Sequence, residues 1–467
     1  MVMKIPLVRA LLFFIGTLVH SWAWSQTVSG KLSAAYKVFA ESPQLRNAIS
    51  SLYIIDAKTG QVVLDRNAEV GLAPASTMKV ITSVSAYELL GKDFQYQTRL
   101  AYYKQEKATS LIILPSGDPT LGSWRWPFTK EESVVKGVIR AIKKAGIKSV
   151  DKIAINNEGW EEEAIPDGWI WQDIGNYYGA GASKLNWREN QFDIILKSGK
   201  QIGDPVIIVK TIPQLSGYAL KSELKSAAVG TGDKAYIYFP LNGVAGIIRG
   251  TIPVNENSFK ISGALPIAAH QLIFTLGDSL SKAGIISPKK ALVATIAKTD
   301  LGKYTVFHTI NSPPLDSLIF WFNRKSINLY GEALVKSLAY KNKGIASTQL
   351  GVDLIKNYWQ AKGIPKAELN MVDGSGLSPL NRITTHAQVS VLQHAQKQAW
   401  FLGFYKALPL YNNMKMKSGT IRDVKGFCGY HRSKDGKEYI FSFLVNNYNG
   451  SAPALVQKMY KVLDELK

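Results

Sequence analysis

The sequence reads Pro74-Ala75-Ser76-Thr77-Met78-Lys79 directly after a predicted β-hairpin and directly before an apolar helical pattern. Apolar residues recur with helical spacing up to Leu90, and Gly91 ends the pattern. Lys79 lies one turn after Ser76, so both side chains are expected on one face of the helix N-terminus. A serine hydroxyl with an amine within reach is the arrangement of an activated nucleophile.

Two further strings follow in a fixed order. Ser326-Ile327-Asn328 comes second, and Lys417-Ser418-Gly419-Thr420 comes third. The first string alone is weak, because Ser-x-x-Lys also begins at Ser133, Ser149, Ser222, Ser279 and Ser287. Lys-Ser-Gly recurs at 197–199, where a hairpin turn is expected, whereas Ser-x-Asn occurs once. The ordered combination therefore indicates a site for serine acyl transfer.

Acyl transfer needs these residue types. Ser76 becomes a nucleophile only when a base takes its proton, and Lys79 can act as that base if its ammonium form is destabilised. Burial and a second cation, Lys417, would both lower the pKa of Lys79. Ser326 would pass a proton to the departing amine. Asn328 completes the predicted catalytic group, because it would help to hold Lys79 and donate to the amide carbonyl of the substrate.

The third string is predicted to bind the end of the substrate. Lys417 and the Thr420 hydroxyl would hold a terminal carboxylate, with Ser418 and Gly419 in the same binding strand. The backbone N–H groups of Ser76 and Thr420 would form an oxyanion hole at a helix N-terminus. All of these groups come from the chain, so no cofactor and no metal is expected. A helix N-cap is the alternative role for Ser76.

Both ends of the chain carry β-hairpins, which predicts one α+β domain split by an insertion. Residues 52–64 form the first predicted hairpin, residues 427–446 form the second, and an amphipathic helix follows over about 452–466. About 245 residues separate the first and second strings, which is enough for one or two inserted domains. Within this insertion we expect a helix over 131–145 and strands over 152–155, 192–196, 206–212 and 235–239.

Residues 1–25 are predicted to be a secretory signal rather than part of the fold. Lys4 and Arg9 precede an apolar run over 10–19, and Ala23-Trp24-Ser25 offers a cleavage site. The run is short for a bilayer span, and a retained N-terminal anchor is the alternative. Export to the periplasm would leave a protein whose single cysteine, Cys428, can form no internal disulfide and is expected to be a small buried hydrophobe.

The formal net charge is +21, and it would fall to +19 without Lys4 and Arg9. The lysines are spread along 467 residues without a nucleic-acid fold signature, so no nucleic-acid partner is expected. An exported basic protein suits an acidic polymer such as peptidoglycan, and peripheral contact with the cell wall or membrane is a further expectation. Solubility alone is an equally good explanation for the charge.

These and several other strings resemble those of the class C low-molecular-mass penicillin-binding proteins, the D-alanyl-D-alanine carboxypeptidase/endopeptidase family. The similar strings span most of the chain: Pro74–Lys79, Gly117–Leu121, Tyr177–Ala180, Asn186-Trp187 and Asp373–Ser378. The resemblance implies a penicillin-binding/β-lactamase-like transpeptidase domain, an antiparallel sheet with helices, interrupted by two nested domains. We predict 26–95 and 301–467 for the catalytic domain, 96–170 and 262–300 for inserted domain II, and 171–261 for inserted domain III.

The implied activity is removal of the terminal D-Ala from peptidoglycan stem pentapeptides through an acyl-enzyme on Ser76. Hydrolysis of D-Ala to diaminopimelate cross-links often accompanies it, and β-lactams would acylate the same serine as covalent inhibitors. The resemblance also implies that Asp173 and Tyr178 contact the free amine end of diaminopimelate and that Leu377 is a wall of the cleft. Structural turns, with buried aromatic residues in one segment and glycines in the other, are the alternatives.

The chain departs from the family pattern at two positions. Pro379 follows Ser378 where members commonly carry a basic residue, so the family's grip on a substrate-side carboxylate does not carry over directly. The third string contains Lys-Ser-Gly in place of the more usual Lys-Thr-Gly, which keeps the hydroxyl group.

Other classes of protein stay open as alternatives. A β-lactamase or esterase shares the acylation chemistry but needs a deacylating base, and spacing assigns no Glu to that role. A non-catalytic peptidoglycan-binding protein would keep the fold and lose the chemistry. A zinc peptidase is disfavoured, because the histidines are scattered and the chain has no His-Glu-x-x-His string.

Overall fold

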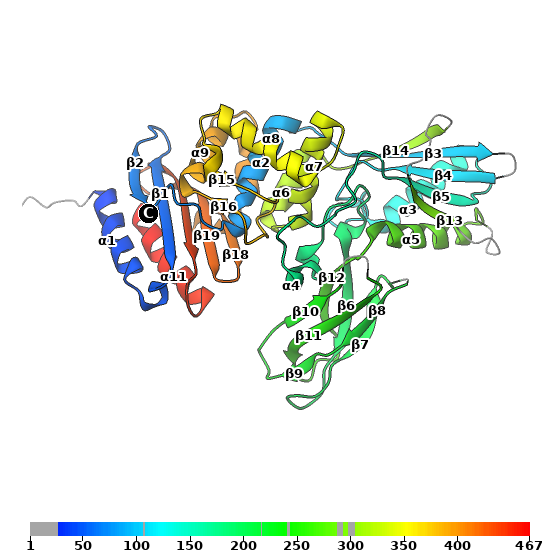
Figure 1. Cartoon of the computed structure of the whole chain (residues 1–467), viewed down its shortest axis with the longest axis horizontal. Helices are drawn as coiled ribbons and strands as arrows, with labels where there is room; N and C mark the ends of the chain where they lie inside the picture. Colours follow the sequence, from blue (N-terminus) through cyan, green and yellow to red (C-terminus); the bar gives the residue numbers. More distant parts are fainter. Residues whose placement is uncertain (1–26, 106–107, 216, 241–242, 287–292, 298–303) are drawn as a thin grey trace, which may run out of the picture.

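The structure is a computed structural model that describes residues 27–105, 108–215, 217–240, 243–286, 293–297 and 304–467. The predicted signal segment, residues 1–25, lies outside the described residues. Within them, no helix has both the length and the apolar character needed to cross a membrane. The elements form three regions, which lie at the left, at the right and below in Figure 1.

The first region is a six-stranded antiparallel sheet that joins the two ends of the chain. Its strand order is β17-β18-β19-β20-β1-β2. The strands are β1 (Ile49–Asp56), β2 (Val62–Arg66), β17 (Leu410–Tyr411), β18 (Met414–Ile421), β19 (Val424–Arg432) and β20 (Glu438–Asn446). β1 pairs with β20 along its whole length, so the N-terminal and C-terminal hairpins form one sheet. The predicted α+β fold, with an antiparallel sheet built from both chain ends, is confirmed.

Helices cover both faces of this sheet, because β19 and β20 are buried along nearly their whole length and present apolar residues on both sides. One face packs against α1 (Val28–Ala40) and α11 (Ala452–Leu463) in a core that includes Phe443. The other face packs against α9 (Thr385–Gln396), which in turn contacts α2 (Lys79–Leu90). Four more helices and one short strand pair complete this layer: α6 (Leu315–Arg324), α7 (Asn328–Lys343), α8 (Thr348–Ala361), α10 (Phe401–Ala407), β15 (Leu369–Asn370) and β16 (Arg382–Ile383).

The second region is a five-stranded sheet with the order β13-β5-β4-β3-β14. Its elements are β3 (Gln97–Gln105), β4 (Ala108–Leu114), α3 (Glu131–Lys144), β5 (Lys152–Asn156), α5 (Ala268–Lys282), β13 (Val293–Ala297) and β14 (Thr305–Asn311). The predicted return to the catalytic domain at residue 301 needs correction. β14 pairs antiparallel with β3, so its backbone groups are satisfied in this sheet, and the chain rejoins the first region only afterwards.

The third region is a small β-structure made of two sheets around Phe192, Ile237 and Ile248. The first sheet has the order β12-β6-β7, and the second has the order β10-β11-β8 with β9 also paired to β11. The strands are β6 (Gln191–Lys197), β7 (Ile207–Ile212), β8 (Ala219–Ser222), β9 (Lys225–Ala227), β10 (Lys234–Tyr238), β11 (Ala245–Pro253) and β12 (Phe259–Ala264). β12 runs past the predicted boundary at residue 261, because it pairs with β6 up to Ala264.

The helix and the strands expected within the insertion are confirmed to within one residue at each end. The other domain boundaries stay predictions. A short helix, α4 (Trp171–Ile174), contacts β10, and the 3₁₀ turn η3 (Tyr177–Gly179) contacts α7. This segment therefore connects the third region to the helical layer of the first.

Candidate active site

A cleft of about 740 Å³ is lined jointly by the first region and by the segments inserted into it. Seven of the residues predicted from the sequence line it: Ser76, Asp173, Tyr178, Ser326, Asn328, Leu377 and Thr420. Lys79 and Lys417 are buried beside the cleft and hydrogen-bond to Ser76 and Ser326 respectively. Ser418 and Gly419 precede Thr420 in β18.

The predicted nucleophile, Ser76, lies on a tight turn rather than in the helix itself. Ala75–Met78 form a 3₁₀ turn, η2, and α2 begins only at Lys79, so the predicted helix start at Ser76 is early. Ala75 has a positive φ of 46°, which is uncommon for a residue with a Cβ. A loop packs on this turn so closely that a Cβ on Gly376 would lie 2.0 Å from the Ala75 carbonyl oxygen. This turn leaves Ser76 at the cleft surface with its backbone tightly packed.

Lys79 is fully buried, and its Nζ has three partners. Ser76 Oγ lies 3.0 Å away, Asn328 Oδ1 2.6 Å and the Ser375 carbonyl oxygen 2.7 Å. The two carbonyl oxygens can only accept hydrogen bonds, whereas the serine hydroxyl can also donate. An ammonium group would donate to all three oxygens, and a neutral amine fits the same geometry with its two N–H groups on the carbonyls and its lone pair facing the Ser76 hydroxyl.

The electrostatics of the site favour that neutral amine. Burial is the largest cause that holds the pKa of Lys79 well below its usual range, and the nearby Lys417 lowers it further. Asp373 and Glu332 oppose the shift by stabilising the ammonium form. Burial also lowers the pKa of Lys417 to about 7. Lys417 can therefore exchange a proton near neutral pH, and the lowered pKa of Lys79 favours its neutral form.

The second and third strings meet beside the nucleophile. Lys417 Nζ donates to Ser326 Oγ at 3.0 Å and to the Ser418 carbonyl at 2.9 Å. Ser326 has a positive φ of 57° and lies two residues before the start of α7. Asn328 Nδ2 donates to the Tyr178 carbonyl at 2.7 Å, so one of its two amide N–H groups is engaged by the inserted segment. Only the other N–H group is left for the predicted contact with the substrate.

β18 runs against the nucleophile turn because residue 419 is glycine. A Cβ at this position would lie 2.6 Å from the Pro74 carbonyl oxygen and 3.0 Å from the Ser76 nitrogen. At the end of the string, the Thr420 hydroxyl accepts a hydrogen bond from Lys425 Nζ at 2.8 Å. The third string, where a terminal carboxylate is predicted to bind, therefore has a lysine neighbour that the sequence interpretation missed.

Cys428 faces Lys417 across the β18–β19 ladder and is fully buried. Burial raises the pKa of its thiol to about 12. The prediction of a buried cysteine is confirmed.

The inserted segment contributes the remaining predicted residues. The Tyr178 hydroxyl donates to Asp173 Oδ1 at 3.2 Å, and burial raises the pKa of Asp173. Both side chains are partly exposed at the cleft. Leu377 lines the cleft as predicted, from a glycine-containing turn.

Asp373 organises that turn from inside. Its carboxylate is fully buried and accepts hydrogen bonds from the backbone N–H groups of Gly376 and Ser378 and from Trp169 Nε1. The cleft wall at Leu377 and the structural turn are therefore two properties of one segment rather than alternatives.

Sequence reasoning missed several contributors to the site, among them the Ser375 carbonyl, Lys425, Arg125 and Glu189. The Ser375 carbonyl is a backbone group, which no side-chain pattern can reveal. Lys425 shares its hairpin with Thr420, so strand pairing could have indicated it. Arg125 lines the cleft and pairs with the buried Glu189, a contact between residues 64 positions apart that no local pattern predicts.

Comparison with known proteins gives the same assignment. The profile of the D-Ala-D-Ala carboxypeptidase 3 (S13) family matches residues 32–466. The chain belongs to this family. S13 membership confirms the predicted family, and it makes the chain a hydrolase of the serine-type D-Ala-D-Ala carboxypeptidase class.

Relatives match along most of their length. The D-alanyl-D-alanine carboxypeptidase of Actinomadura sp. (strain R39) is 25% identical over 461 residues, which cover 89% of this chain and 81% of the relative. The D-alanyl-D-alanine carboxypeptidase DacB of Haemophilus influenzae is 24% identical over 418 residues, which cover 83% of each. The crystal structure of penicillin binding protein 4 from Haemophilus influenzae superposes with a TM-score of 0.78 at 21% identity, covering 93% of this chain and 99% of that one. This S13 member therefore has the fold of that protein.

Proposed function

We propose that this S13 member removes the terminal D-Ala from peptidoglycan stem peptides through an acyl-enzyme on Ser76. The observation that carries the proposal is the environment of Lys79. Its fully buried Nζ has two carbonyl oxygens for its N–H groups and the Ser76 hydroxyl as its third partner. That arrangement suits a neutral amine that takes the serine proton.

In the proposed acylation step, Ser76 Oγ gives its proton to Lys79 Nζ and forms a bond to the carbonyl carbon of the penultimate D-Ala. The backbone N–H groups of Ser76 and Thr420 stabilise the oxyanion. The C–N bond to the terminal D-Ala then breaks, and the departing amine takes a proton from the Ser326 hydroxyl. Lys417 returns a proton to Ser326, to which it donates a hydrogen bond at 3.0 Å. Deacylation runs these transfers in reverse, with water in place of the amine. Water gives a proton through Ser326 to Lys417 and attacks the acyl carbon, and Ser76 Oγ leaves and takes its proton back from Lys79.

The preference for a terminal residue would come from the cationic end of the cleft. Lys417, the Thr420 hydroxyl and Lys425 are neighbours on the β18–β19 hairpin. Together they supply charge and donors for a free carboxylate. A peptide whose last carboxylate is amidated would lose this interaction.

Hydrolysis of D-Ala to diaminopimelate cross-links is the proposed second action, because the same acyl group is transferred and only the leaving amine differs. Asp173 supports this extension, since it is a carboxylate at the cleft surface beside Tyr178. A carboxylate there suits the free ammonium group of a diaminopimelate residue. The exported location, with residues 1–25 as a cleaved signal, belongs to the same proposal, as does peripheral contact of the basic protein with the wall or membrane.

Covalent labelling tests the nucleophile. The protein without residues 1–25 is incubated with a fluorescent penicillin, and the labelled peptide is identified by mass spectrometry. We expect the label on Ser76 and none in Ser76→Ala. Ser133→Ala is the matched control, because Ser133 also begins a Ser-x-x-Lys pattern but lies at the exposed start of α3. A folded wild-type protein that takes no label would contradict the proposal.

Product analysis separates the proposed activity from the alternatives. Two defined muropeptides, one ending in D-Ala-D-Ala and one cross-linked, are incubated with the protein. The released amines are then identified by mass spectrometry. Release of D-Ala with slow turnover of a chromogenic cephalosporin supports the peptidase. Rapid cephalosporin turnover without D-Ala release would indicate a β-lactamase, and labelling without either turnover would indicate a binding protein.

A further inference from the structure

Three consecutive residues at the start of the third region have an unusual backbone. Arg188, Glu189 and Asn190 have φ values of 56°, 52° and 50°, although none of them is glycine. Non-glycine residues adopt this left-handed conformation singly and at a cost in free energy, so a run of three persists only where the surroundings enforce it. The side chains of this turn show what enforces it.

The three side chains bind three different parts of the molecule. Arg188 pairs with Glu131 at the start of α3 in the second region. Asn190 Nδ2 donates to the Gly181 carbonyl at 2.8 Å and to Asn186 Oδ1 at 2.8 Å. Glu189 reaches the helical layer of the first region through Tyr330. The turn is therefore a junction between the inserted regions and the catalytic one.

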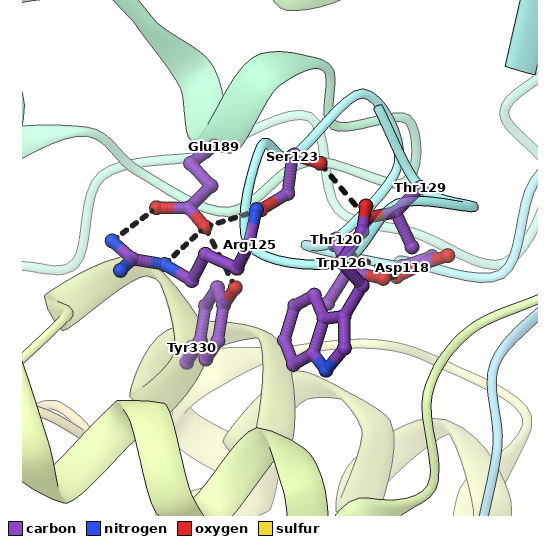
Figure 2. Close-up of polar contacts among 8 residues, drawn as sticks. All are labelled: Asp118, Thr120, Ser123, Arg125, Trp126, Thr129, Glu189 and Tyr330. Carbon is purple, nitrogen blue, oxygen red and sulfur yellow. Dashed lines mark hydrogen bonds and ion pairs between the residues drawn. The ribbon is translucent and has the colours of Figure 1, made fainter. Parts of the chain in front are cut away.

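Glu189 is the centre of this junction (Figure 2). Its side chain is fully buried and forms two hydrogen bonds with Arg125, from Nε at 2.6 Å and from Nη2 at 2.9 Å. The Ser123 hydroxyl donates to the same carboxylate at 2.7 Å, and the Tyr330 hydroxyl donates at 2.8 Å. We call Glu189, Arg125, Ser123 and Tyr330 the Glu189 network. A buried carboxylate with four donors from two other chain segments, residues 123–125 and Tyr330, holds those segments at fixed distances from its own.

The network reaches the cleft through Arg125. Arg125, which hydrogen-bonds to Glu189, and Gln191, two residues after Glu189, both line the cleft together with Ser76 and Ser326. The Arg125 guanidinium is held against Trp321 of α6, 5.1 Å from the ring centroid. Tyr330 lies in the first turn of α7, the helix that begins with Asn328. The network thus ties one wall of the cleft to the helix that carries the second motif.

We propose that Glu189 is a positioning residue that holds the inserted wall of the cleft, at Arg125 and Gln191, at its working distance from α7. This inference rests on the proposed function and deepens it. A stem peptide is long enough to contact that wall as well as Ser76, whereas a penicillin molecule needs little more than the catalytic groups. Loss of the network should therefore weaken the use of long peptides and spare acylation by a small β-lactam.

Tyr330→Phe is the main test variant, because it removes one hydroxyl from the network and leaves the Arg125–Glu189 ion pair intact. Glu189→Gln is the stronger variant, but it leaves Arg125 without its charge partner and can impair folding. Glu132→Gln is the matched control, since it makes the same chemical change in an exposed ion pair with Lys136 on α3. Rates of acylation by penicillin and kcat and KM for D-Ala release from a pentapeptide muropeptide are measured for each.

For Tyr330→Phe we expect kcat/KM on the muropeptide to fall about tenfold, mainly through KM, with penicillin acylation within about twofold of wild type. Equal losses on both substrates would overturn the proposal, because they would mean that the network acts through the catalytic centre or through stability. No loss on either would overturn it as well. Glu132→Gln should match wild type in both assays.

Hydrogen exchange gives a readout that does not depend on activity. In Tyr330→Phe, backbone amides in residues 120–130 and 186–191 should exchange faster while those of α2 stay unchanged. Unchanged exchange in the two segments would show that Tyr330 does not hold the wall, whatever the enzyme does. A wild-type protein that fails to take penicillin would refute the proposed function and leave this exchange result to decide the positioning role.

Discussion

Gly419→Ala is the perturbation that bears most directly on how the fold places the nucleophile. An added Cβ would lie 2.6 Å from the Pro74 carbonyl oxygen, 2.9 Å from the Thr77 nitrogen and 3.0 Å from the Ser76 nitrogen. These distances are 0.4 to 0.8 Å shorter than an ordinary contact of 3.4 Å. All three contacted atoms belong to backbone, so β18 or the nucleophile turn must move.

The size of the effect follows from that displacement. A misplacement of about 1 Å in a catalytic group costs roughly 10²-fold in rate, so a shift of about half that size should slow acylation by about 10-fold. Overpacking of this kind should also destabilise the fold by about 1–3 kcal/mol. The second-order rate of acylation by a fluorescent penicillin measures the first effect, and urea unfolding measures the second.

Gly137→Ala is the matched control, because a Cβ at Gly137 in α3 would meet no atom within 4 Å. Alanine is the better helix former, so this variant should gain about 0.5–1 kcal/mol in stability and acylate at the wild-type rate. If folded Gly419→Ala acylates within about twofold of wild type, the close approach of β18 does not position Ser76, and the reasoning fails.

Three further predictions concern titration and reactivity. Lys417→Gln removes a positive neighbour of Lys79, so the ammonium form of Lys79 gains stability, its pKa rises, and the acid limb of the pH profile for penicillin acylation should move to higher pH. Asp118 is buried, and its pKa is raised from 3.8 to about 6. The contribution of this carboxyl group to the free energy of unfolding is therefore fully present below pH 3.8 and is lost as the pH rises through about 6, a change of roughly 3 kcal/mol in all. Urea unfolding of Asp118→Asn, which keeps an oxygen acceptor for Thr120, should lack this decline between pH 4 and pH 7; an equal decline would contradict the assignment. Cys428 should resist a maleimide in the native protein and react after unfolding, and mass spectrometry of a native sample that shows modification would refute its burial.

Much of the fold could be predicted from local patterns. The hairpin at 52–64, the helix at 131–145 and the strands of the third region each depend on spacing and turn residues that lie within a few positions of one another. The boundary at residue 301 could not be predicted in this way. β14 pairs with β3, which lies some 200 residues earlier in the chain. The boundary therefore depends on a pairing at the edge of the sheet between strands that are distant in sequence.

The same division applies to the site. The three motifs, in their order, determined which hydroxyl, amine and amide groups are available for acyl transfer, because the chemistry of a side chain follows from the residue type alone. Tertiary structure alone decided that the Ser375 carbonyl would be the second acceptor for Lys79, and that the Tyr178 carbonyl would accept from one of the two Asn328 amide N–H groups. It alone decided that Arg125, Glu189 and Tyr330 would meet. The physical reason is that burial and hydrogen bonding are properties of groups brought together from distant positions, and these properties set the pKa of a base and the shape of a cleft.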